Sequence, residues 1–122
     1  MNFQACRWPV EYGPPEVTHH FTALDAPAAS ARGTAITLSH FVPRIDVMPY
    51  FISAERLPVC PVLGAAALDA QVRAANSSLH VHGHSHINRR ADIDGMTHLN
   101  NTPSYPKETR IAAIRLLCVF EH

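Results

Sequence analysis

The sequence predicts an α/β fold, and three observations lead to this prediction. Apolar, β-branched runs occupy residues 34–41 and 79–82, each directly after a glycine or a serine. An alanine-rich stretch at 63–75, well suited to a helix, separates the two runs. An Asp-Gly pair then precedes a third apolar run at 96–100, as in a β-hairpin. Strands interleaved with helices in this order are typical of an α/β domain with a mixed sheet and flanking helices.

In chain order, the first element expected is a helix. Residues 1–13 are irregular, whereas Pro14-Pro15-Glu16 suits a first helical turn, because proline is tolerated there and an acid favours the positive end of the helix dipole. The side chains that recur with the spacing of one helix face are Val17, His20, Phe21 and Leu24. Asp25-Ala26-Pro27 ends the helix, and a loop of small residues follows at 28–33.

The middle of the chain is expected to hold a strand, a loop and a helix. Thr34–Phe41 is rich in β-branched and apolar residues, so it is predicted to be a buried strand. Four prolines and no clear period between Pro43 and Pro61 predict a long surface loop. Leu63–Ala75 is the predicted helix, and Asn76-Ser77-Ser78 stops it.

Three further strands are expected after this helix. Leu79–His82 would be a strand with its two aliphatic side chains on one face and its two histidines on the other. Asp92–Gly95 is predicted to be the turn of a hairpin whose second strand is Met96–Asn100. Ile111–Phe120 is the last predicted strand.

Composition narrows the class of protein. The chain has 122 residues, about one domain, and its net charge of zero gives no indication of a nucleic-acid or anionic-membrane partner. No apolar run approaches the length of a membrane span and the N-terminus has no apolar signal region, so we expect a cytoplasmic protein without a membrane partner. The three cysteines lie far apart in sequence and are expected to be reduced thiols.

Histidines dominate one short stretch, LHVHGHSH at 79–86. Alternate residues of a strand share a face about 7 Å apart, and imidazoles at that spacing can converge on a cation. His84 and His86 follow a predicted strand, as His40 follows another, and parallel neighbouring strands would bring these ends to one edge of the sheet. Gly83 is expected to let the chain turn there. The sequence thus predicts a metal site made by His40, His84 and His86, for Mn, Fe or Zn.

The same residues resemble a known family. SHFVP at 39–43, followed by VHGHSH at 81–86, resembles the C-terminal half of calcineurin-like metallophosphoesterases, and ACRWP at 5–9 extends this resemblance. The resemblance implies a four-layer αββα sandwich and two metal ions that activate a hydroxide for hydrolysis of a phosphate ester. It also implies that His40 and His84 bind one metal and His86 the other.

The acidic half of the family's motif set is absent. The sequence contains no D-x-H, no G-D-x-x-x-D and no G-N-H-E/D, so residues 1–122 are expected to be the C-terminal portion of one phosphoesterase domain, without its N-terminal half. Two divalent ions about 3.7 Å apart would repel by roughly 18 kcal/mol at an effective dielectric constant of 20. Three neutral imidazoles do not offset this repulsion. We therefore expect at most one ion here and an isolated chain that is inactive, with no catalytic residue of its own.

Several polar residues flank the histidines. Arg44 and Arg89, with Arg90, lie next to the predicted ligands in sequence and are expected to bind a substrate phosphate, because guanidinium matches its geometry; solvated surface arginines are the alternative. Asn100 and Asn101 are expected in a turn, and closure of the rim of the site is the alternative.

Two other functions remain open at this stage. One is a non-catalytic interaction protein that docks on a partner carrying the missing half, or on itself, through an exposed apolar sheet face. The other is a simple metal-binding module that uses the histidines of 80–86 for storage or delivery.

Overall fold

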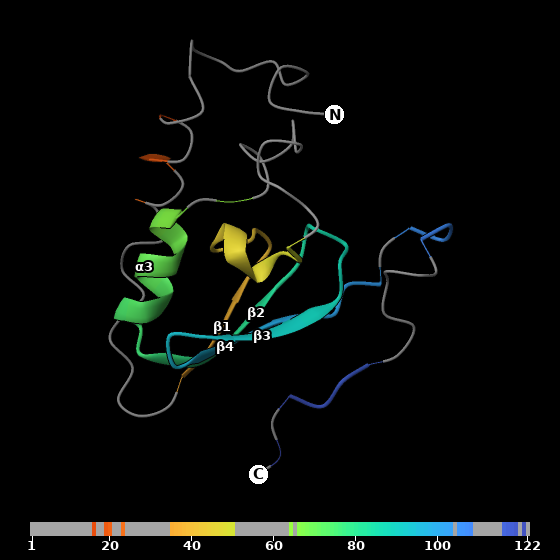
Figure 1. Cartoon of the computed structure of the whole chain (residues 1–122). Coiled ribbons are helices and arrows are strands. Elements are labelled where there is room, and N and C mark those ends of the chain that lie inside the picture. Colours follow the sequence, from red (N-terminus) through yellow and green to blue (C-terminus); the bar gives the residue numbers. More distant parts are fainter. Residues whose placement is uncertain are drawn as a thin grey trace.

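The structure, a computed structural model, describes part of the chain, namely residues 16, 19, 20, 23, 35–50, 64, 66–103, 105–108, 116–119 and 121. The elements in order are β1 (Ala35–Ser39), the 3-10 helix η2 (Ile45–Val47), α3 (Ala66–Ala74), β2 (Ser77–His82), β3 (Arg89–Ile93) and β4 (Met96–Asn100) (Figure 1). None of the helices in these residues has the length and apolar character that crossing a bilayer requires.

The four strands form one mixed sheet in the order β1-β2-β4-β3. β1 and β4 both run parallel to β2, and β3 pairs antiparallel with β4. The registers Ser39↔His82, His82↔Asn100 and Arg89↔Asn100 bring these four residues to one end of the sheet. We call this end, with the segments that follow β1 and β2, the rim. The α/β class is confirmed, and so is the parallel pairing of the two strands that precede His40 and His84.

The hairpin turn also lies where the sequence predicts it. Asp94 and Gly95 have φ values of 49° and 78°, and the flanking residues Ile93 and Met96 are paired. Two central residues with positive φ are typical of the type I′ turn, which Asp-Gly favours. The first strand of this hairpin, β3, has the sequence RRADI and lacks the apolar alternation that would have given its bounds.

The prediction of a long surface loop between Pro43 and Pro61 is partly wrong. Residues 45–47 form η2, and Val42 and Val47 are each only 3% exposed, in a cluster against which Ile93 packs. Gly64 forms a bridge with Val42, and a Cβ there would lie 1.7 Å from the Val42 carbonyl oxygen, so this close approach requires a glycine.

The structure describes only some residues of the elements predicted near the two ends of the chain. Of the expected N-terminal helix, the described residues 16, 19, 20 and 23 are helical, and the rest lies outside the described residues. Within the predicted strand 111–120, residues 116–119 are not in a strand, and the other positions lie outside the described residues.

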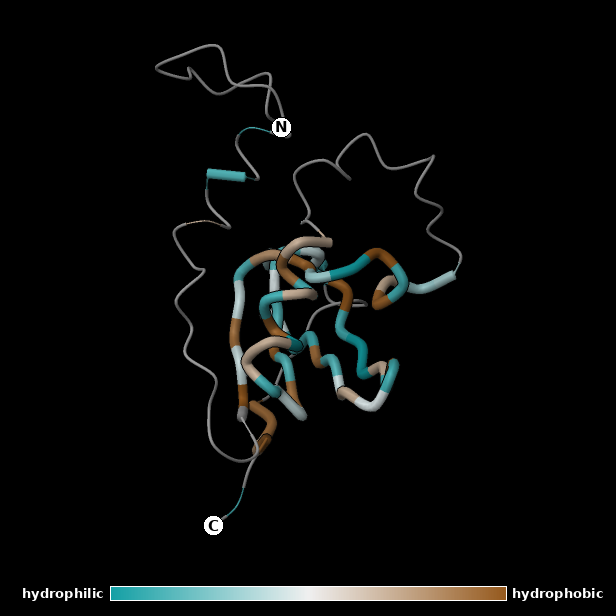
Figure 2. Tube along the Cα trace, turned by 90° about the vertical axis from the view of Figure 1, so that its left-hand side faces the viewer, coloured by the Kyte–Doolittle hydropathy of each residue, from teal (hydrophilic) through white to brown (hydrophobic). Residues whose placement is uncertain are grey.

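The two faces of the sheet differ in an unusual way. Hydrophobic and hydrophilic residues alternate along the strands (Figure 2). α3 and η2 lie on the same side of the sheet (Figure 1), and the strand residues on that side include His80 and His98, both 0% exposed. The opposite side, which we call the open face, carries the apolar side chains of Ile36, Leu38, Leu79, Val81 and Leu99. Leu38 is 77% exposed, so among the described residues the covered face is the histidine face. The open face is apolar over β1 and β2 and polar towards β3, where Thr97, Arg90 and Asp92 share it.

His80 is held in the core by hydroxyl groups. Its Nδ1 lies 2.9 Å from Thr37 Oγ1 and its Nε2 lies 3.0 Å from Ser39 Oγ. Both partners stand on β1, so the imidazole links the two parallel strands. Burial lowers the pKa of His80 to about 4, with His82 and His98 acting in the same direction and Asp69 opposing them. Burial is also the main cause of the lowered pKa of His98.

These buried histidines predict acid sensitivity. Between pH 6.5 and pH 4 the unfolded chain binds protons that the native His80 does not, so the free energy of unfolding should fall as the pH drops through this window. The slope contributed by one buried histidine is up to about 1.4 kcal/mol per pH unit. Urea unfolding from pH 7.5 to pH 4 measures it. His80→Gln should reduce the slope, and a variant with the slope of the wild-type protein would contradict this account.

Candidate functional site

Two of the predicted histidines meet at the rim. His40 directly follows β1, and the Gly83 N–H, directly after β2, donates a 3.2 Å hydrogen bond to the His40 carbonyl oxygen. This bond continues the parallel pairing by one step. The rings of His40 and His84 are then 4.7 Å apart between centroids, at an interplanar angle of 62°. The Phe41 ring lies 5.1 Å from the first and 5.3 Å from the second, so three rings form one cluster.

The backbone of the loop Gly83–His86 is unusual at its histidines. His84 has φ 62° and His86 has φ 55°, both in the left-handed region that non-glycine residues avoid. Such residues cost about 1–3 kcal/mol each and persist only where their surroundings fix them, frequently at functional sites. The chain turns at Gly83 as expected, because its carbonyl oxygen accepts the Ser85 N–H at 2.7 Å, but the positive φ of this turn falls on His84. A Cβ on Gly83 would lie 3.5 Å from the His40 carbonyl oxygen, which is an ordinary contact distance, so the approach of these two segments does not require a glycine.

Asn100 fixes this loop from β4. Its Nδ2 donates to the Gly83 carbonyl oxygen at 3.2 Å and to Ser85 Oγ at 2.8 Å. Its Oδ1 accepts the Thr102 N–H at 3.1 Å and the Thr102 hydroxyl at 2.7 Å. The side chain is 2% exposed, and these four bonds use the hydrogen-bonding capacity of a carboxamide. The expected turn at this position is therefore wrong: Asn100 ends a strand and holds the histidine loop.

A second carboxamide joins the end of the loop to the same segment. Asn88 Nδ2 donates to the Thr102 carbonyl oxygen at 3.3 Å, and Asn88 Oδ1 accepts the Thr102 N–H at 2.6 Å. The loop is thus attached to the chain after β4 at both of its ends.

His86 has different partners from the other two histidines. Its Nδ1 lies 2.9 Å from Glu108 Oε2, and its ring makes an edge contact with Tyr105 at a centroid distance of 4.9 Å. Within the residues that the structure describes, no three His, Cys, Asp or Glu side chains are placed to hold one metal ion. The rim therefore brings together His40 and His84, and the predicted three-histidine cluster is not formed in the described part of the chain.

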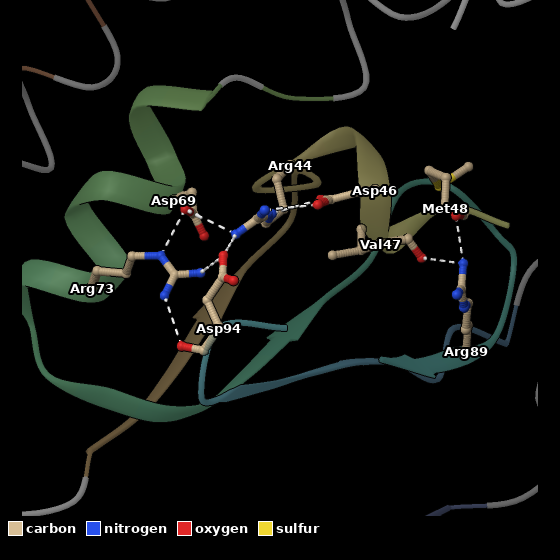
Figure 3. Close-up of polar contacts among 8 residues, drawn as sticks. All are labelled: Arg44, Asp46, Val47, Met48, Asp69, Arg73, Arg89 and Asp94. Carbon is tan, nitrogen blue, oxygen red and sulfur yellow. Dashed lines mark hydrogen bonds and ion pairs between the residues drawn. The ribbon is translucent and has the colours of Figure 1, made fainter. Parts of the chain in front are cut away.

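Arg44 lies away from the rim (Figure 3). Its guanidinium pairs with Asp46 at 2.6 Å and with Asp94, in the β3–β4 turn, at 2.9 Å. Arg73 of α3 binds Asp69 at 2.8 Å and donates to the Asp94 carbonyl oxygen at 3.3 Å, so these charges join η2, α3 and the hairpin. This turn and the rim are at opposite ends of β4, about 13 Å apart, the rise of four strand residues. In the structure the Arg44 guanidinium is held by carboxylates, and its predicted contact with a substrate phosphate stays a prediction.

Arg89 begins β3 at the rim end of the sheet. Its Nη1 donates to the carbonyl oxygens of Met48, at 2.5 Å, and Val47, at 3.3 Å (Figure 3). These bonds attach the end of η2 to the sheet. Arg90 points to the opposite face of β3 and is 3.6 Å from Asp92.

Sequence reasoning missed Glu108 at the rim, and for Asn100 it preferred a turn over closure of the rim. Nothing local marks Asn100, because its role depends on the pairing of β2 with β4. Glu108 has a local signal: it lies two residues after Pro106, a spacing typical of a first helical turn, and its carboxylate accepts the Tyr105 N–H at 3.0 Å.

The chain was compared with family models, curated proteins and solved structures. No family model matches the chain, and no curated protein or solved structure matches it. The chemistry of the rim therefore has to be argued from its residues.

The role of Asn100 predicts a position-specific loss of stability. Asn100→Asp keeps the size of the side chain but removes both Nδ2 donors and places a carboxylate oxygen near the Gly83 carbonyl oxygen. We expect the free energy of unfolding to fall by about 3 kcal/mol, since buried partners are left unsatisfied. The same change at the half-buried neighbour, Asn101→Asp, is the control and should cost less than half as much. Similar losses for both variants in urea unfolding would contradict the role of Asn100.

Proposed function

We propose that this chain provides the histidine side of a divalent-metal centre for phosphate-ester hydrolysis, as the C-terminal portion of a calcineurin-like metallophosphoesterase domain. The observation that carries the proposal is the meeting of His40 and His84 at the ends of two neighbouring parallel strands. They are the residues that the motifs S-H and G-H-S-H pair in that family. Their rings come together from positions 44 residues apart, in a loop held by a buried asparagine.

The described residues do not complete such a centre. His40 and His84 suit a cation, because imidazole is a common ligand of Zn and Fe, but three ligands are not assembled. The sequence lacks the motifs with which a phosphoesterase supplies the acids that offset the charge of its metals. We derive no catalytic step for the chain alone. The proposal is that acids from another polypeptide segment complete the centre at this rim.

The open face supports the proposal that the partner has an apolar surface. Its aliphatic side chains lie on the side of the sheet opposite α3 and η2, and Ile36 and Leu38 are 38% and 77% exposed. Leu79, Val81 and Leu99 on the same face are half-buried. Exposed apolar side chains gathered on one face are typical of an interface. A second β-sheet with an apolar inner face and acidic strand ends would both cover it and bring carboxylates to the rim, as in an αββα sandwich.

Among the arginines, Arg89 is the one that can contribute to substrate binding in this proposal. It lies at the rim end of β3, whereas Arg44 is committed to the hairpin turn at the other end. Its present partners are two carbonyl oxygens, so a phosphate ester, which binds guanidinium more strongly than a neutral carbonyl does, would compete for it.

Zinc binding tests the proposal. The chain should bind one Zn²⁺ in a calorimetric titration at pH 7.5, and His40→Ala and His84→Ala should each weaken the affinity at least tenfold, because each removes an imidazole ligand. His19→Ala, an exposed histidine on the N-terminal helix, is the matched control.

Two results would contradict the proposal. One is zinc affinity that does not change in His40→Ala and His84→Ala. The other is hydrolysis of bis-p-nitrophenyl phosphate with Mn²⁺ at the rate of a complete enzyme, since the proposal places the acids outside this chain.

The open face also favours a second candidate function, that of a non-catalytic protein that associates with itself. Leu38→Glu should then weaken self-association, measured by sedimentation equilibrium, at least tenfold, because it places a charge in the apolar contact. Ile45→Glu is the control: Ile45 is 47% exposed but belongs to η2, on the other side of the sheet. A wild-type chain that stays monomeric at all concentrations, or equal effects of both variants, would refute this candidate.

A further inference from the structure

Glu108 is an acid to which the sequence assigns no role, and the structure brings it to one of the rim histidines. Its Oε2 lies 2.9 Å from His86 Nδ1, and the two side chains are 31% and 25% exposed. The separation in sequence is 22 residues, so the contact depends on the fold. The pair is thus partly shielded from solvent and joins the loop Gly83–His86 to the segment after β4.

A second set of contacts fixes the carboxylate. Oε2 of Glu108 also accepts the Tyr105 N–H at 3.0 Å, and the Glu108 N–H donates to the Tyr105 carbonyl oxygen at 2.9 Å. The bond to the Tyr105 carbonyl oxygen closes a four-residue turn, and the carboxylate bond to the Tyr105 N–H corresponds to the Glu half of a capping box. The Tyr105 ring packs edge-on against the imidazole at an interplanar angle of 70°. One short turn therefore holds His86 by its Nδ1 atom and by its ring.

We propose that Glu108 is a positioning residue that keeps His86 in the Nδ1–H tautomer, so that Nε2 is the atom with which His86 binds a divalent cation at the rim. An ionised carboxylate only accepts hydrogen bonds, so Nδ1 must donate, and a neutral imidazole carries one N–H. Nε2 then keeps its lone pair. The cation part of this inference rests on the proposed function, whereas the tautomer does not.

The chemistry explains why an acid at this place matters. Histidines that bind metals commonly donate their second ring N–H to a carboxylate, which orients the ring and increases its basicity as a ligand. A plain exposed ion pair would contribute only about 0–1 kcal/mol to stability. It would require neither the second hydrogen bond that fixes Oε2 nor the ring contact of Tyr105.

The tautomer is measured by ¹⁵N NMR of the metal-free full chain at pH 8. His86 signals are assigned by their loss in His86→Gln. The wild-type ring should be mainly Nδ1–H, and Glu108→Ala and Glu108→Gln should shift it towards Nε2–H. Glu16→Gln, at an exposed position on the N-terminal helix, should have no effect. A wild-type ring that is mainly Nε2–H, or a ring unchanged in Glu108→Ala, would overturn the inference.

The cation is tested separately, with Zn²⁺ as the probe. Glu108→Ala should weaken zinc affinity about 10–100-fold in a calorimetric titration, the usual effect of removing such a partner. Unchanged affinity would overturn the role of Glu108 in binding. If the wild-type chain binds no Zn²⁺ but the tautomer shifts as expected, the proposed metal centre and the cation part fail, while the positioning of His86 by Glu108 is supported.

Discussion

The parallel pairing of β1 with β2 is the constraint on which the rim depends. Its register aligns Ser39 with His82, and the hydrogen bond from the Gly83 N–H to the His40 carbonyl oxygen extends this alignment by one residue. His40 and His84 therefore leave the sheet side by side. A shift of one residue in either strand would send one of these side chains to the other face of the sheet. His80, bonded to two hydroxyl groups of β1, opposes such a shift because it would lose both partners.

The distribution of polarity across the sheet gives this constraint its energetic context. In most half-covered sheets the apolar face is buried, because burial of apolar area is the main driving force for folding. Here α3 and η2 cover the face with His80, His98 and Asn100, while the aliphatic side chains of the open face remain partly in contact with water. Burial of these polar side chains costs free energy unless they are hydrogen-bonded. Asn100 is fully hydrogen-bonded. Neither ring nitrogen of His98 has a hydrogen-bond partner among the described residues. Among the described residues, the apolar side chains of the open face therefore contribute less to burial than the polar side chains of the covered face do.

Local patterns in the sequence were sufficient for the class of fold and for the identity of two rim residues. β-branched runs, an alanine-rich helix and an Asp-Gly turn each depend on neighbours in sequence, and the structure confirms all three. The features that escaped prediction depend on distant contacts: the core role of Val47 and the hold of Asn100 on Gly83. The ion pairs of Arg44 depend on distant contacts as well. Proximity in sequence to His40 suggested a place at the rim, but its ion pair with Asp94 draws the side chain to the opposite end of the sheet.

X-ray absorption spectroscopy of the zinc-loaded chain addresses the central claim most directly, because it counts the imidazoles around the metal. If His40 and His84 share one cation, the spectrum should show at least two imidazole nitrogens at about 2.0–2.1 Å, with oxygen completing the shell. Removal of either side chain should lower the imidazole count by one. A spectrum that is the same with and without His40 would mean that the two rings meet for packing alone, and the proposed centre would have to be abandoned.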